Sequence, residues 1–181
     1  MRLISVLGLF VLSVAACTQV ATPLKTDSST TTKAASQLHL PMLTVGSSAG
    51  APGEQVQIAL SFLNSTGIQV TSLSADIAFD DAALEIIDAK PGPDLLPGYQ
   101  LLSGKSASNL LRLGVISFSA PKTIKDGVIA TVNFRVKPEA KIGNTKVTLK
   151  PGASDARGNF VAISGSNGLV QIMPQELKKN P

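Results

Sequence analysis

The fold of this protein is decided by residues 128–136, which read VIATVNFRV. Apolar side chains fall on every second position, and polar side chains occupy three of the four positions between them: Val128, Ala130, Val132, Phe134 and Val136 against Thr131, Asn133 and Arg135. Successive side chains of a strand point to opposite sides, so a period of two is typical of a strand with one face on a core. We therefore predict that this stretch is a half-buried strand.

The same alternation recurs on both sides of this stretch. It is clear at residues 56–62 and 72–79. Further short strands are expected at 40–47, 84–89, 99–105, 109–118, 145–150, 159–163 and 168–173. Residues that favour turns separate these segments, and no amphipathic helix lies between them. The pattern predicts an all-β fold, an antiparallel two-sheet β-sandwich of about nine strands with jelly-roll topology.

The composition agrees with one compact β domain. The chain has 181 residues, of which 44% are hydrophobic, 4% aromatic and 15% charged. This is too apolar for a disordered chain. The single cysteine, Cys17, excludes an intramolecular disulfide. Together with the single histidine, His39, it also removes most catalytic metal clusters.

The N-terminus has the layout of a secretory signal. Arg2 precedes an apolar run at residues 3–14, which is shorter than the roughly 20 residues that span a bilayer. The sequence VAAC at residues 14–17 resembles the bacterial lipobox, which implies cleavage before Cys17 and a diacylglycerol on its sulfur. Acyl chains there would hold the protein on a membrane. The alternative is an ordinary signal peptide with a chance cysteine.

The chain is expected to have four parts. They are a signal peptide at 1–16, a lipid-anchored Ser/Thr-rich tether at 17–38, the folded domain at 39–173 and a polar tail at 174–181. Removing residues 1–16 takes away one of 16 basic residues and none of 12 acidic ones, which leaves 15 against 12. The basic residues form no block of five or more, so no nucleic-acid partner is expected.

A series of short motifs in the folded part resembles a known family. They are PGEQVQI at 52–58, TGI at 66–68, IAFD at 77–80, LEII at 84–87, PG at 91–92, KDGVIA at 125–130, FRVK at 134–137, Asp155, Gly158 and GLVQI at 168–172. In this order and spacing, over about residues 40–173, they resemble a cohesin domain. Cohesins are the receptor modules to which dockerins bind in cellulosomes and related bacterial assemblies.

The resemblance implies a function. It implies a non-catalytic module that captures a dockerin-like partner protein, in the context of polysaccharide breakdown. It also implies no cofactor for this chain, because the calcium of that interaction belongs to the dockerin. Cohesins often place polar side chains on the face that meets the dockerin helix. Allowing two extra residues, the nearest equivalents here are Ser72 and Ser74, and alternation places Asp76 on the same side.

The residues themselves do not favour catalysis or a bound metal. Asp80 and Asp81 are adjacent at a predicted strand end, where cohesins commonly have Asp-Pro, and adjacent carboxylates cannot flank a glycosidic bond. Asp126 and Asp155 sit beside glycines and are interpreted as turn residues. The serines have no histidine partner inside the domain. We therefore expect no enzyme, no catalytic residues and no metal site.

Two other functions stay open. A carbohydrate-binding module uses a related sandwich, but the chain has no Trp and one tyrosine, Tyr99, and its phenylalanines fall mostly on inward positions. The second open function is that of a structural envelope lipoprotein without a dockerin partner. A protein partner is favoured over a polysaccharide. The expected location is outside the cytoplasm, lipid-anchored to the envelope at the outer membrane or cell surface.

Overall fold

The computed structural model describes residues 40–119 and 121–175. The expected signal peptide, the whole of the tether with Cys17, and most of the tail lie outside the described residues. The described strands are β1 (Met42–Val45), β2 (Ser48–Gly50), β3 (Gln55–Leu63), β4 (Ser72–Phe79), β5 (Leu84–Pro91), β6 (Tyr99–Ala107), β7 (Leu110–Ser117), β8 (Gly127–Val136), β9 (Gly143–Ser154), β10 (Ser164–Ser166) and β11 (Gly168–Ile172).

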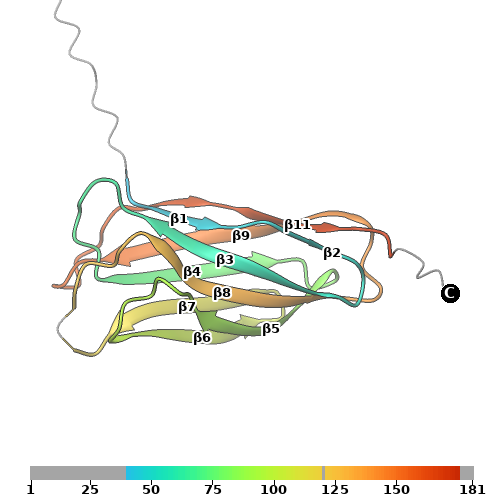
Figure 1. The fold of residues 1–181 in the computed structure, drawn as a ribbon, viewed down its shortest axis with the longest axis horizontal. Helices are drawn as coiled ribbons and strands as arrows, with labels where there is room; N and C mark the ends of the chain where they lie inside the picture. Colours follow the sequence, from blue (N-terminus) through green and yellow to red (C-terminus); the bar gives the residue numbers. More distant parts are fainter. Residues whose placement is uncertain (1–39, 120, 176–181) are drawn as a thin grey trace, which may run out of the picture. The chain divides into compact units, whose positions relative to one another are not determined.

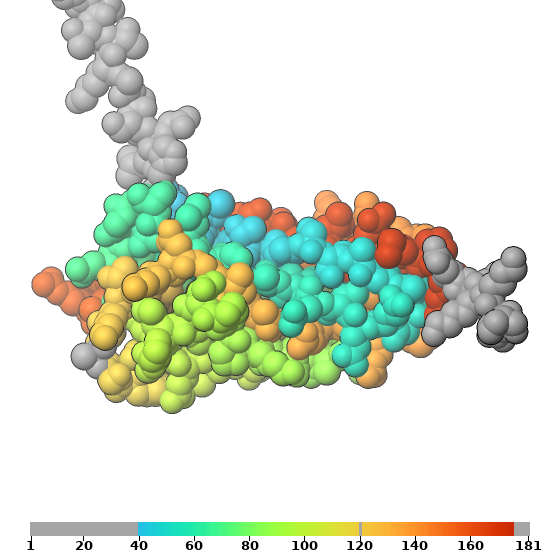
Figure 2. Space-filling view, in the orientation of Figure 1, coloured from blue at the N-terminus to red at the C-terminus, as the bar shows by residue number. Residues whose placement is uncertain are grey.

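The strands form two sheets packed face to face (Figure 1). The order of the five-stranded sheet is β10-β1-β3-β8-β5, and that of the six-stranded sheet is β2-β11-β9-β4-β7-β6. Consecutive strands alternate between the sheets, except for the β6–β7 hairpin. The β-sandwich with jelly-roll topology predicted from the sequence is therefore confirmed. Figure 2 shows the side on which β1 and β3 lie, coloured blue to teal.

The predicted strand at 128–136 is β8, and it lies in the five-stranded sheet between β3 and the edge strand β5. Phe134 is completely buried, and its ring meets that of Phe79 from the other sheet edge to face, with ring centroids 5.2 Å apart. One inward position is corrected. A β-bulge at Leu60/Ser61 leaves Ile129 without a partner on β3, so Ile129 is buried and Val128 is only half-buried.

The sequence missed two short strands, β2 and β10. Their sequences, SAG and SGS, carry no apolar alternation, and backbone pairing at the sheet edges defines them. The strand expected at 159–163 is wrong, because that segment contributes only an isolated bridge between Ser154 and Phe160. The sheets are also not wholly antiparallel. β1 pairs with β10, and β2 with β11, in parallel, because the first and last described segments run side by side.

Between the sheets lies one core built from both. Its largest fully buried side chains include Phe62, Phe134, Leu43, Leu60 and Ile77.

None of the described segments forms a helix long and apolar enough to cross a membrane. The outward sides of the two sheets are therefore the main surfaces on which a function can be sought.

Candidate partner-binding face

The three predicted site residues lie together on β4. Leu73, Ala75 and Ile77 point into the core, so Ser72, Ser74 and Asp76 point to the outer face of the six-stranded sheet. This orientation is as expected from the alternation. On this sheet β4 has β9 on one side and β7 on the other. Binding of a partner by these residues stays a prediction.

The three residues have different surroundings. The Ser72 hydroxyl oxygen lies 2.5 Å from that of Ser154 on β9, a hydrogen bond that holds β4 to β9. Asp76 accepts a hydrogen bond from Arg112 Nε at 3.0 Å, in an ion pair across β4 and β7. Ser74 is the exposed member of the three. It is therefore the most accessible of the three hydroxyl and carboxylate groups.

Ser74 lies in a row with almost no side chains. It pairs with Gly114 on β7 and with Gly152 on β9. A Cβ atom built at Gly152 would lie 2.5 Å from the Ser74 oxygen, whereas one at Gly114 would meet only Leu102 Cβ, at 3.9 Å. We call Gly114, Ser74 and Gly152 the glycine row. Another chain can approach the backbone closely at Gly114, whereas the Ser74 hydroxyl lies over Gly152.

Residues with longer side chains, such as Arg112 and Ile116 on β7, lie on both sides of the glycine row. A charged row lies two residues further along the strands. In this row Asp76 lies opposite Arg112 on β7 and opposite Lys150 on β9 in the strand register. In the opposite direction lie Ile116 on β7 and Ser72 on β4. At about 3.3 Å per residue, the two borders are roughly 13 Å apart. This backbone spacing is similar to the diameter of an α-helix with its side chains, about 10–12 Å.

A hairpin after β9 adds an exposed aromatic ring to this face. The Asp155 carboxylate accepts hydrogen bonds from the backbone N–H groups of Arg157 (2.8 Å) and Asn159 (2.9 Å) and from Asn159 Nδ2 (2.9 Å). These bonds, chiefly that of the Asn159 side chain, lower the pKa of Asp155. Phe160 then bridges Ser154 in antiparallel fashion. Opposite residues of such a pair share one face, so Phe160 points outward with Ser154.

The position of Phe160 corrects part of the aromatic prediction. Phe62, Phe79 and Phe134 are buried, but Phe160 is 78% exposed and Phe118 is 73% exposed. The only sequence signal was the turn formed by Asp155 and the glycine that follows, because the bridge to Ser154 is a tertiary feature. We therefore add Phe160, Gly114 and Gly152 to the candidate site.

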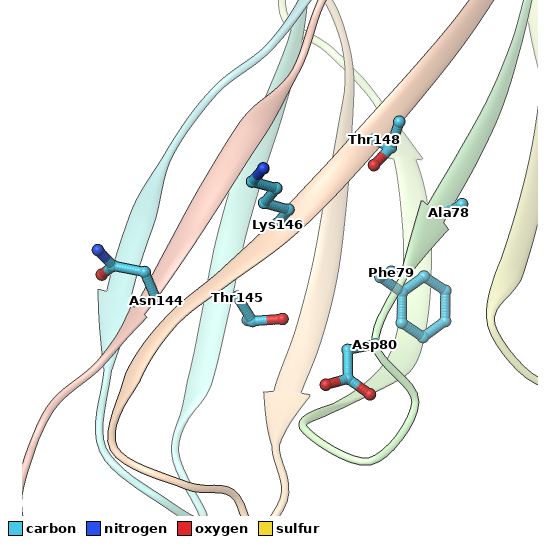
Figure 3. A pocket seen from close by; sticks show the side chains of 7 residues that line it. All are labelled: Ala78, Phe79, Asp80, Asn144, Thr145, Lys146 and Thr148. Carbon is cyan, nitrogen blue, oxygen red and sulfur yellow. The ribbon is translucent and has the colours of Figure 1, made fainter.

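An open concavity of about 460 Å³ lies at the far end of β4, next to the start of β9 (Figure 3). Ala78, Asp80, Asn144, Lys146 and Thr148 line it with Phe79 and Thr145. Its chemistry is mixed and polar, and the ring of Phe79 belongs to the core. It therefore lacks an exposed aromatic platform on which a sugar could stack.

The described residues contain no group of three or more His, Cys, Asp or Glu side chains that could hold a metal ion. Asp80 caps a turn, since its Oδ1 accepts the Ala82 N–H at 3.0 Å. Asp126 accepts the Asn64 N–H at 2.7 Å. Asp80 stabilises a turn, as the sequence predicted, whereas Asp126 joins its loop to the residue that follows β3.

The cohesin domain family matches residues 41–172, nearly all of the described sandwich. This protein is a cohesin. A curated relative, cellulose-binding protein A of Clostridium cellulovorans, is 32% identical over 155 residues. The match covers 83% of this cohesin but only 8% of the relative, so this cohesin spans a small part of that protein's length.

Solved structures of other cohesins share the fold. The sixth cohesin of scaffoldin B from Acetivibrio cellulolyticus, solved in complex with a mutant dockerin, has a TM-score of 0.66 at 23% identity, covering 74% of this chain and 99% of that one. A non-cellulosomal cohesin from the archaeon Archaeoglobus fulgidus has a TM-score of 0.62 at 22% identity, covering 76% and 94%. At these identities the likeness establishes the sandwich alone.

Proposed function

We propose that this cohesin is a non-catalytic module that captures a dockerin-like domain on the outer face of its six-stranded sheet. The observation that carries the proposal is the glycine row, bordered by charged side chains on one side and by Ile116 and Phe160 on the other. A partner helix lying across β7, β4 and β9 would fit between these borders. Family membership and similar cohesins solved with dockerins support this partner.

The small residues of the glycine row would let the backbone of a partner come close to the sheet. Backbones approach each other most closely where no Cβ atom intervenes, and dispersion energy rises steeply at short separation. The Ser74 hydroxyl at the centre of the row can donate to or accept from the partner. Binding energy at interfaces concentrates on a few central positions. We therefore place the centre of the interface at Ser74, with Ser72 and Asp76 beside it.

The proposed cellular setting is the outside of the cell envelope. Residues 1–16 would be removed, acyl chains on Cys17 would anchor the protein, and residues 17–38 would hold the sandwich away from the lipid. The Clostridium cellulovorans relative is named as a cellulose-binding protein, and this name supports a setting in which polysaccharide is the nearby substrate. Mass spectrometry of the mature N-terminus tests the anchor, and an unmodified Cys17 would disprove it.

The docking face is tested by capture from the organism's own secreted proteins. Full-length protein purified in detergent should retain a protein that carries a dockerin, recognised by its two calcium-loop repeats. The capture should be lost in a chelator, because the calcium belongs to the dockerin. It should also be lost with Ser74→Arg, which puts bulk and charge into the glycine row.

The matched control is Gln57→Arg, the same replacement at an exposed position of β3 on the other sheet. It should capture the same protein as wild type. Equal capture by both variants would place recognition elsewhere on the molecule. If no captured protein carries a dockerin, a structural lipoprotein becomes the better description.

One observation favours a second candidate function. The exposed rings of Phe118 and Phe160 are the aromatic surfaces that a carbohydrate-binding module would need. Retention of the protein on insoluble cellulose, and its loss when both are replaced by alanine, would support that function.

A further inference from the structure

We propose that the surface of the dockerin-like partner facing β9 is acidic, with carboxylates that meet Lys146 and Lys150. This inference rests on the proposed function, because it assigns a charge to the partner of the same face. It follows from the distribution of charge on the two sides of the sandwich and from the positions of the two lysines beside the glycine row.

The outer face of the six-stranded sheet carries an excess of positive charge. Among its described outward strand positions the charged side chains are Lys146, Lys150, Arg112 and Asp76, which is three basic against one acidic. Arg112 and Asp76 form an ion pair. Both lysines are exposed, and no ion pair within 4.0 Å joins either to a described residue. Two positive charges are therefore available to a partner.

The outer face of the five-stranded sheet differs. Its charged strand positions are Glu85, Asp88, Lys90 and Arg135, two acidic and two basic. Arg135 lies 3.6 Å from Glu85, and Lys90 lies 3.2 Å from Asp88. Each charge on that face has a partner within the sheet. The two lysines without an ion-pair partner are thus a property of the candidate face and not of the whole surface.

The lysines are placed so that a docked partner would reach both. Lys150 lies opposite Asp76 in the strand register, in the charged row that borders the glycine row. Lys146 lies four residues earlier on β9, roughly 13 Å away, and points to the same side. It lines the concavity at the end of β4 (Figure 3). A helix in the glycine row would bring one carboxylate to Lys150, and the part of the partner over the concavity would bring another to Lys146.

The carboxylate of Asp80 also lines this concavity. It does not neutralise Lys146, because no ion pair within 4.0 Å joins them and its Oδ1 accepts the Ala82 N–H. Charges at the border of an interface mainly set association rate and partner choice, and their effect falls with salt. An acidic partner would be attracted and a basic one repelled.

The experiment uses a phage library of dockerin domains as probe. Exposed positions of the two dockerin helices are varied among Asp, Glu, Lys, Arg, Ser and Leu, and the library is selected with calcium against the full-length protein. Clones bound by wild type should be enriched in Asp and Glu. Lys146→Gln with Lys150→Gln should weaken their affinity about 10-fold at low salt, consistent with exposed charge pairs, and less at high salt.

The control is Gln55→Glu with Gln57→Glu, which changes net charge by the same two units on the other sheet. At about 0.15 M salt, where the Debye length is about 8 Å, it should leave affinity within about twofold of wild type, because the far sheet lies beyond that distance. Binders without acidic enrichment, or equal losses in the two double variants, would overturn the acidic-partner inference. If those binders are lost with Ser74→Arg, the docking face still stands. A library with no binders, or binders indifferent to Ser74→Arg, would overturn the proposed function itself.

Discussion

The two outer faces of this sandwich come from the same alternating pattern, yet they have different surfaces. On the five-stranded sheet Asp88 accepts a hydrogen bond from Asn133 and pairs with Lys90, so its polar groups are satisfied within the face. On the six-stranded sheet a row of three positions has one small side chain, and two lysines have no ion-pair partner in the described part of the chain. Alternation along one strand defines which of its residues are outside, while the neighbouring strands define the surface that those residues form together.

The largest expected effect concerns the core that both faces share. Phe134 belongs to the five-stranded sheet and its ring packs against Phe79 of the six-stranded sheet. Phe134→Ala should lower the free energy of unfolding by about 3–5 kcal/mol, because it leaves a cavity between the sheets. Thr131→Ala, on the outer side of the same strand, should cost less than about 1 kcal/mol. Equal losses in a denaturant titration would contradict the register of β8.

The next largest effect is a loss of dockerin affinity, without a loss of stability, when a side chain is added on the six-stranded sheet but not on the other sheet. Gly114→Val should fill the glycine row, and affinity for the captured dockerin should fall at least about 10-fold, as for other central interface positions. The melting temperature should hardly change, because the nearest atom to the new Cβ is 3.9 Å away and valine favours strands. Thr131→Val on the opposite face is the control. Calorimetric titration of both variants decides, and unchanged affinity in Gly114→Val would remove the glycine row from the interface.

A smaller effect is expected at the exposed ring. Phe160→Ala should weaken dockerin binding about 5-fold, since a ring at the border of an interface loses less than one at its centre. Its stability should be that of wild type, because the side chain is exposed. Leu63→Ala removes an exposed apolar side chain from the outer face of the other sheet and should leave affinity unchanged. Equal affinities for all three proteins would limit the interface to the strands.

The smallest effect is a dependence on acid. The hydrogen bond from Asn159 lowers the pKa of Asp155, and the hydrogen bond from Asn133 lowers the pKa of Asp88, both from an ordinary value of 3.8. A lowered pKa means that the ionised form stabilises the fold. Each contribution is therefore complete above pH 3.8 and is lost as the pH falls through the lowered pKa.

The two carboxylates should differ in their effect on binding. Asp155→Ala should loosen the hairpin that presents Phe160 and weaken dockerin binding about 3-fold at neutral pH, less than removal of the ring itself. Asp88→Ala, on the other sheet, should leave binding unchanged. Surface plasmon resonance measures both. A larger loss from Asp88→Ala would mean that the five-stranded sheet takes part in recognition.

Much of the fold could be predicted because each long strand carries its own signal. The alternation at 72–79 placed Ser72, Ser74 and Asp76 outside, and the structure agrees. The prediction was wrong where the local sequence pattern and the pairing of the strands disagree. The bulge at Leu60/Ser61 turned Ile129 inward. The short edge strands β2 and β10 exist only because other strands lie beside them.

The amino-acid pattern alone predicted a β-sandwich and most of the outward side chains of its long strands, and its motifs resemble those of a cohesin. Only the tertiary structure decided that Gly114, Ser74 and Gly152 share a row and that Phe160 stands beside Ser154. The physical reason is that alternation is a property of one strand, set by the geometry of successive residues. A docking face is a property of several strands, and their register depends on pairing between segments far apart in the chain.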